Sequence, residues 1–238
     1  LAVALVAVAG DRAGAQDVAV APPESATGSQ SGAPIVSIAD ALATRDSGDT
    51  VRVAGRLAAD PHRYTPRSLY VSLQQGGHGL WLFARRRFPD ARAGDSVVAT
   101  GVVQNYRGTT ELVLGGLRVV PGERRVPEPA NAPADAATPV AEREGRLLRV
   151  RGVAGEQGVS EGGRWLRLHP LAPGERARAA LHGADSITIW VPASHVAAPP
   201  IEHVRAGDVL DVVGIGGVYQ DNPGDPPVAQ LLPREPAD

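Results

Sequence analysis

Aromatic and arginine residues lie close together at several points in the first half of the chain. Aromatic rings stack on nucleic-acid bases and guanidinium groups neutralise phosphates, so this mixture suits a single-stranded nucleic acid. The same mixture suits an anionic glycan, a phospholipid head group or a protein partner. The candidate ligand-binding residues are Arg63, Tyr64, Arg67, Tyr70, Trp81, Arg85, Tyr106 and Arg107.

Residue types for covalent or metal chemistry do not form a recognisable arrangement in the sequence. The chain has no cysteine, and its six histidines do not have the spacing of a metal site. Ser194 and His195 are adjacent, which cannot by itself orient a nucleophile against its base. Gly214–Gly217 does not open a helix as a phosphate-binding loop does, and Asp221–Asp225 lacks the spacing of a calcium loop. We therefore expect a protein that is not an enzyme and that binds no metal and no cofactor.

The basic charge is concentrated in one part of the chain. Residues 51–120 contain ten arginines and four acidic residues, a net charge of +6, whereas residues 146–234 are neutral. All 24 basic residues of the chain are arginine, so the run Arg85-Arg86-Arg87 also fits a solvated turn in an arginine-rich composition. The aromatic residues likewise fit plugs at the ends of a barrel. From the sequence, these structural alternatives stay open beside the binding hypothesis.

The first residues are typical of an export signal. Leu1–Ala9 is a continuous apolar run, and Ala13-Gly14-Ala15 is a cleavage site of the A-x-A type. The run is much shorter than the roughly 20 residues that cross a bilayer, although a truncated membrane anchor or a core segment is the alternative. We expect residues 1–15 to be a signal peptide whose start lies upstream, residues 16–34 to be a disordered linker, and the protein to be periplasmic or secreted.

Two sequence landmarks occur twice in the same order, which indicates a duplication. The strand-like run Val51–Gly55 returns as Leu148–Gly152, 97 residues later. The tetrapeptide Arg-Ala-Gly-Asp at residues 92–95 returns at residues 205–208, 113 residues later. The second copy therefore holds about 16 extra residues, most of which we place in the helix-compatible stretch 170–184.

Each copy contains five short runs with strand character, separated by turn signals. Five strands with glycines in the first and fourth favour a partly open Greek-key barrel over an immunoglobulin-like sandwich, which has about seven. Ser37 is expected to cap a small helix before the first copy, with Gly48 at its end. The predicted strands are 51–58, 69–74, 80–84, 96–106 and 110–120 in copy one, and 146–154, 164–169, 186–191, 209–218 and 228–232 in copy two. We expect an all-β protein of two tandem five-stranded barrels, at residues 35–120 and 146–234, joined by a Pro/Ala-rich linker at residues 121–145 that a short helix crosses.

At these strands the sequence resembles the OB-fold superfamily, in particular its exported bacterial branches. The resemblance covers about residues 35–232 of the chain. Its motifs are generic for the fold and say little about function. They are Ser37–Leu42 with Gly48–Gly55, Leu69–Gln74, Gly79–Phe83, Ala93–Val97 and Ala206–Leu210.

The resemblance implies a binding face and a class of function. OB domains that bind oligomers use the face of their second and third strands, and alternation predicts Tyr70 on that face in copy one. On the third strand alternation turns either Leu80 and Leu82 or Trp81 and Phe83 inward, and of these options we expect Trp81 to lie outward. Exported OB domains occur in the extracytoplasmic regions of sensor histidine kinases, in periplasmic stress proteins and as accessory modules of secreted nucleases. Tandem pairs are typical of the sensors, so we expect an exported, non-enzymatic region that binds a small ligand, an oligomer or a protein partner. The alternative is a secreted module that binds single-stranded nucleic acid. Copy two is expected to serve as a structural or protein-contacting partner of copy one.

Overall fold

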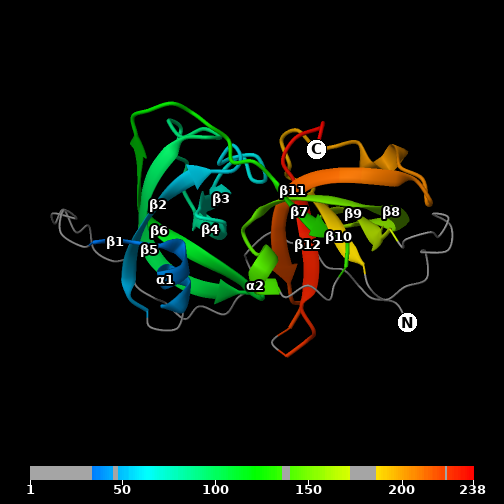
Figure 1. Cartoon of the computed structure of the whole chain (residues 1–238), viewed down its shortest axis with the longest axis horizontal. Helices are drawn as coiled ribbons and strands as arrows, with labels where there is room; N and C mark the ends of the chain where they lie inside the picture. Colours follow the sequence, from blue (N-terminus) through cyan, green and yellow to red (C-terminus); the bar gives the residue numbers. More distant parts are fainter. Residues whose placement is uncertain (1–33, 45–47, 136–139, 172–185, 223) are drawn as a thin grey trace.

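The strands form two six-stranded sheets, one in each half of the chain, and the halves lie side by side (Figure 1). The computed structural model describes residues 34–44, 48–135, 140–171, 186–222 and 224–238. The expected signal peptide and the linker up to residue 33 lie outside this part, as does nearly all of the helix-compatible stretch in copy two. None of the described helices is both long enough and apolar enough to cross a membrane.

The first barrel is a closed sheet with an OB-like strand order. Strands β2, β3 and β4 form an antiparallel meander, β4 pairs in parallel with β6, and β5 pairs with both β6 and β2. The pairing of β5 with β2 closes the barrel. Its elements are β1 (Ile35–Val36), α1 (Ile38–Ala43), β2 (Thr50–Leu57), β3 (Leu69–Gln75), β4 (His78–Ala84), β5 (Ser96–Tyr106) and β6 (Thr109–Val120).

The second barrel repeats this topology. Strands β8, β9 and β10 are antiparallel, β10 pairs in parallel with β12, and β11 closes the barrel between β12 and β8. Its elements are β7 (Ala130–Pro133), α2 (Val140–Arg143), β8 (Leu147–Ser160), β9 (Gly163–Pro170), β10 (Ile187–Pro192), η2 (Ile201–His203), β11 (Val209–Tyr219) and β12 (Val228–Pro233). The predicted fold class, an all-β pair of tandem OB-like barrels with minor helices, is thereby confirmed.

The repeat unit begins earlier than its sequence landmarks indicate. Strand β7 pairs in parallel with β8, as β1 does with β2, and each of the two short strands is followed by a short helix. The second sheet therefore starts at Ala130, inside the stretch expected to be linker, and α2 is the helix expected there. Strand β8 also continues to Ser160, so residues 155–163, which lie between two of the predicted strands, are mostly strand and a tight hairpin.

Local sequence explains two features of these elements. The Ser37 side chain accepts a hydrogen bond from the Asp40 N–H and so caps α1, which ends at Ala43, before the predicted Gly48. Gly55 and Gly152 occupy equivalent bends, where a Cβ atom would lie 2.6 Å from the Gln74 carbonyl oxygen and 2.4 Å from that of His169. Only glycine lets the neighbouring strand approach so closely.

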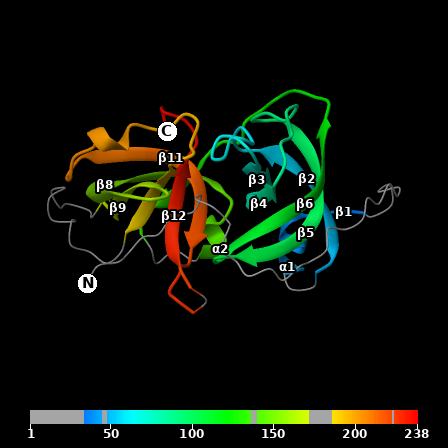
Figure 2. The ribbon, with the colours of Figure 1, turned by 180° about the vertical axis from the view of Figure 1, so that it is seen from behind.

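A continuous hydrophobic core joins the two barrels. Trp190, Ile215 and Leu232 of the second barrel belong to the same buried cluster as the interior of the first barrel. A separate cluster fills the second barrel alone, around Val150, Leu168 and Ile189. The view from behind shows α2 at the boundary between the halves (Figure 2). The barrels are thus packed as one unit along this boundary, called the barrel interface below.

Candidate functional site

The outward face of β3 and β4 carries the aromatic residues that the sequence singled out. Ser72 lies opposite Trp81 and Tyr70 opposite Phe83, whereas Val71 and Leu73 lie on the other face, toward the barrel core. The rings of Tyr70 and Trp81 stack at 4.5 Å with an interplanar angle of 8°. Trp81 therefore points away from the core of its own barrel, as alternation predicts.

The second barrel covers this face. The Trp81 indole N–H donates to the Gly216 carbonyl oxygen at 3.2 Å, and the Tyr64 hydroxyl donates to the Leu232 carbonyl oxygen at 3.1 Å. Trp81 is 0% exposed and Tyr64 is 1% exposed, and burial raises the pKa of Tyr64 well above its usual range. The expectation that these two residues form part of an open binding surface is corrected, because both are used in the barrel interface.

The matching face of the second barrel was missed in the sequence. Trp190 lies opposite Trp165 on β10 and β9, and Arg167 lies opposite Thr188. The Arg167 guanidinium donates to the Thr188 hydroxyl at 2.6 Å and lies 5.8 Å from the centre of the Trp165 ring. Burial lowers the pKa of Arg167. The alternation of Trp165 and Arg167 along β9 is the signal that would have indicated a second aromatic face.

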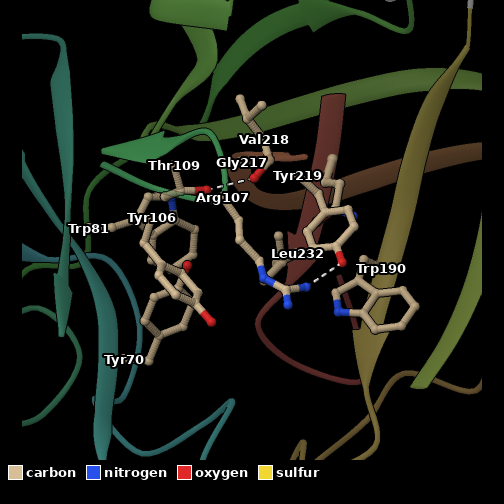
Figure 3. A pocket seen from close by; sticks show the side chains of 11 residues that line it. Tyr70, Trp81, Tyr106, Arg107, Thr109, Trp190, Gly217, Val218, Tyr219 and Leu232 are labelled. Carbon is tan, nitrogen blue, oxygen red and sulfur yellow. Dashed lines mark hydrogen bonds between the residues drawn. The ribbon is translucent and has the colours of Figure 1, made fainter. Parts of the chain in front are cut away.

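A small cavity lies in the barrel interface, lined by aromatic rings from both barrels (Figure 3). Its volume is about 30 Å³, which suffices for a water molecule but not for an aromatic ring. The Trp190 indole N–H is buried beside it and has no hydrogen-bond partner among the described residues. Four predicted site residues line the cavity, namely Tyr70, Trp81, Tyr106 and Arg107, together with Trp190 and Tyr219 of the second barrel.

Arg107 links the two barrels at this cavity. It has a φ of 51° at the turn between β5 and β6, a left-handed conformation that is uncommon outside glycine. Its guanidinium donates to the Tyr219 hydroxyl at 2.7 Å, and that hydroxyl donates to Asp221 at 2.8 Å. Burial and the bond to Asp221 raise the pKa of Tyr219. Arg107 thus serves to hold the interface at its edge while its own side chain stays exposed.

Arg67 and Arg85 lie elsewhere, in a group of exposed arginines at one end of the β3–β4 pair. Because Leu69 pairs with Ala84, the residues just before β3 and just after β4 are brought together. His62 fixes the arrangement, since its Nδ1–H donates to the Ser68 carbonyl oxygen at 2.7 Å and its Nε2 accepts the Phe88 N–H at 3.3 Å. The group consists of Arg67, Arg85, Arg86 and Arg87 and is called the arginine cluster below.

Arg63, the remaining predicted residue, lies beside Tyr64 in the barrel interface. Its guanidinium forms an ion pair with Asp60 at 3.2 Å, and its carbonyl oxygen accepts the Val196 N–H at 2.9 Å. The structure therefore divides the eight predicted residues among three places: the cavity, the arginine cluster and the edge of the interface around Tyr64.

Ser194 and His195, the adjacent serine and histidine of the sequence, are hydrogen-bonded to backbone groups. The Ser194 hydroxyl donates to the Tyr64 carbonyl oxygen at 2.6 Å, and His195 Nε2 donates to the Pro233 carbonyl oxygen at 3.0 Å. The two side chains are thus bonded to backbone rather than to each other. Across the described ranges, no group of three histidine or acidic side chains is placed to hold a metal ion.

Comparison with known proteins gives only distant structural matches. No family model and no curated protein matches the sequence. The crystal structure of fission yeast Pot1 with single-stranded DNA is similar at 11% identity, with a TM-score of 0.33, over 77% of this chain and 78% of that chain. The structure of p202 HIN1 with a 12-mer double-stranded DNA is similar at 10% identity, with a TM-score of 0.32, over 75% and 87%. At these values the likeness carries no weight, so fold and site rest on the strand pairing and contacts described above.

Proposed function

We propose that the protein is a non-enzymatic binding module that holds single-stranded nucleic acid at the arginine cluster. The observation that carries this proposal is the convergence of four exposed arginines at the end of β3 and β4, on a barrel segment with a net charge of +6. Phosphate neutralisation by arginine is the main source of sequence-independent affinity for nucleic acid.

The charges of the cluster are available to a ligand. Within the described part of the chain, no carboxylate forms an ion pair with Arg67, Arg85 or Arg87. The Arg86 guanidinium donates to the Gly115 carbonyl oxygen at 2.8 Å and lies 4.9 Å from the centre of the Phe88 ring. Phe88 is half-buried, so the cluster presents charge together with one partly accessible ring, the combination that single-strand binding uses.

Fluorescence anisotropy with a labelled 15-nucleotide oligothymidine, measured across a salt series, tests the proposal. We expect binding that weakens steeply with salt, and we expect the double variant Arg85→Ala/Arg87→Ala to lower affinity at least about tenfold and the salt slope by about two. The matched control is Arg149→Ala/Arg164→Ala, because these exposed arginines pair with Asp211 and Glu202 in the other barrel. Absence of binding at low salt, or equal affinity in the two double variants, contradicts the proposal.

A second candidate function is the ligand- or partner-binding region of an exported sensor. It is favoured by the tandem pair of OB-like barrels, the arrangement that the sequence resemblance associates with exported sensor regions. The complete reading frame tests the sensor assignment. A membrane-spanning helix and a kinase core downstream support it, whereas a nuclease domain in the same frame contradicts it.

A further inference from the structure

A groove lies between the two barrels, at the end of β3 and β4 opposite to the arginine cluster. Its walls are the β3–β4 turn, the segment of residues 125–130 that leads into β7, and the start of β8. Its volume is about 410 Å³, within the range of small-molecule sites. None of the predicted site residues lines it, and it is separate from the cavity in the barrel interface.

Three arginines from different elements line this groove: Arg56 on β2, Arg125 in the segment before β7, and Arg146 just before β8. Arg56 Nη1 donates to the carbonyl oxygens of Gly94 and Glu123 at 3.1 Å and 2.9 Å. Arg146 Nη1 donates to the Glu142 carbonyl oxygen at 2.9 Å. These carbonyl groups position two guanidinium groups without neutralising their charge.

The charge of the groove is positive and incompletely compensated. Among the described residues, neither Arg56 nor Arg146 forms an ion pair with a carboxylate. Arg125 pairs with Glu128 at 3.8 Å, but both side chains are largely exposed, so this ion pair is weak. Glu128 is the only acidic residue of the lining, so three arginines leave a net charge of +2.

Two amide side chains of the lining are held by hydrogen bonds within the protein. Gln74 Nε2 donates to the Ser72 hydroxyl at 2.8 Å, and Gln75 Oε1 accepts the Ile38 N–H at 2.9 Å. The two amide side chains are therefore fixed before any ligand arrives. A site of this kind loses little side-chain entropy on binding an anion.

We propose that this groove binds the phosphate group of a phosphorylated ligand. The planar fork of a guanidinium matches phosphate oxygens with two parallel hydrogen bonds, and three such forks from separate elements suit a dianion. Glu128 lies 3.8 Å from the Arg125 guanidinium, so its negative charge opposes the binding of a phosphate there. The proposal for this groove does not rest on the nucleic-acid function proposed for the arginine cluster.

Isothermal titration calorimetry with pyrophosphate at low salt tests the inference. We expect Arg146→Gln to weaken binding at least about tenfold, because it removes a charged donor to the phosphate, and Glu128→Gln to tighten it several-fold, because it removes a negative charge that opposes the phosphate. The control is Arg118→Gln, an exposed arginine on β6 outside the groove, which leaves binding unchanged. A gain of affinity in Glu128→Gln cannot come from a failure to fold. Absence of binding by the unmodified protein, or equal affinity in Arg146→Gln and Arg118→Gln, overturns the inference.

The source of the phosphate is distinguished by titrating the same variants with the labelled oligothymidine. Unchanged oligonucleotide affinity in Arg146→Gln assigns the groove to a small phosphate ester. A matching loss of oligonucleotide affinity assigns it to phosphates of a bound strand. Either result supports phosphate recognition at this groove. If Arg85→Ala/Arg87→Ala leaves oligonucleotide affinity unchanged, only the proposed function of the arginine cluster is contradicted.

Discussion

Trp81 of the first barrel and Gly216 of the second are joined by a hydrogen bond from the indole N–H to the carbonyl oxygen, at 3.2 Å. The same carbonyl oxygen accepts the Gly145 N–H at 2.9 Å. A single backbone group of β11 therefore ties together the outward face of the first barrel and the entry to the second. The bond explains how a polar indole N–H is satisfied at a fully buried position.

Removing this ring is expected to destabilise the whole protein. Trp81→Ala leaves a large cavity between the barrels and should lower the free energy of unfolding by about 3–5 kcal/mol. Urea denaturation followed by circular dichroism measures the change. Val159→Ala is the control, because Val159 is 79% exposed and its truncation should change stability by less than about 0.5 kcal/mol. A loss below about 1 kcal/mol for Trp81→Ala would mean that the interface contributes little.

The two barrels are expected to unfold in one cooperative transition. The core of the first barrel extends through Trp190 and Leu232 into the second, so neither barrel can open without exposing apolar side chains of the other. Differential scanning calorimetry of the full chain should give a calorimetric enthalpy close to the van't Hoff enthalpy. Two resolved transitions would show that the barrels are independent.

Two glycines with similar backbone conformations are expected to differ in how much stability is lost on substitution by alanine, because only one of them is in close backbone contact across the interface. Gly145 has a φ of 68°, and a Cβ there would lie 2.6 Å from the Gly79 carbonyl carbon. Gly76 has a φ of 57° but open space around it. Gly76→Ala should cost about 1–2 kcal/mol for the left-handed conformation, and Gly145→Ala should cost about 1–3 kcal/mol more for the clash. Equal losses of stability in urea would contradict the close approach.

Acidification is expected to weaken the interface at His195. Burial lowers the pKa of this imidazole, which packs edge-on against Tyr64 at 5.3 Å, while the charges of Arg63 and Asp238 act on this pKa in opposite directions. The unfolded chain then binds more protons than the folded one, so stability rises with pH through the window below about 6.5. The urea concentration at the midpoint of unfolding should decrease as the pH is lowered from about 7 to about 5.5. This decrease should be smaller in His195→Gln than in the control His203→Gln, because His203 is exposed. Equal slopes would exclude His195 as the source.

Much of the fold could be predicted because the strands follow the alternation of inward and outward side chains. Val71 and Leu73 face the core, and this fixes Tyr70 and Trp81 on the opposite face. What covers that face could not be predicted, because an aromatic outward face is equally typical of a ligand site and of a contact between domains. The Trp165 and Trp190 face of the second barrel is the complementary half of the contact, and only the tertiary structure brings the two together.

Elements that depend on tertiary contacts were also missed. Strand β7 has the sequence Ala-Asn-Ala-Pro, which carries no strand pattern, and it is extended because β8 offers it a parallel edge. The groove with Arg56, Arg125 and Arg146 was missed for a related reason. Its arginines are 69 and 21 residues apart in sequence, so no local motif connects them.

The two aromatic sheet faces cover each other, so neither face is open to a ligand. A single OB barrel presents this sheet face to a ligand, whereas here the face of each barrel is occupied by the other barrel. Under the two proposals above, a third molecule would bind at the ends of the first barrel, where the loops and the connecting segment lie. Sequence changes in those loops would then alter binding without disturbing the sheets, and specificity and stability would be carried by different residues of the same chain.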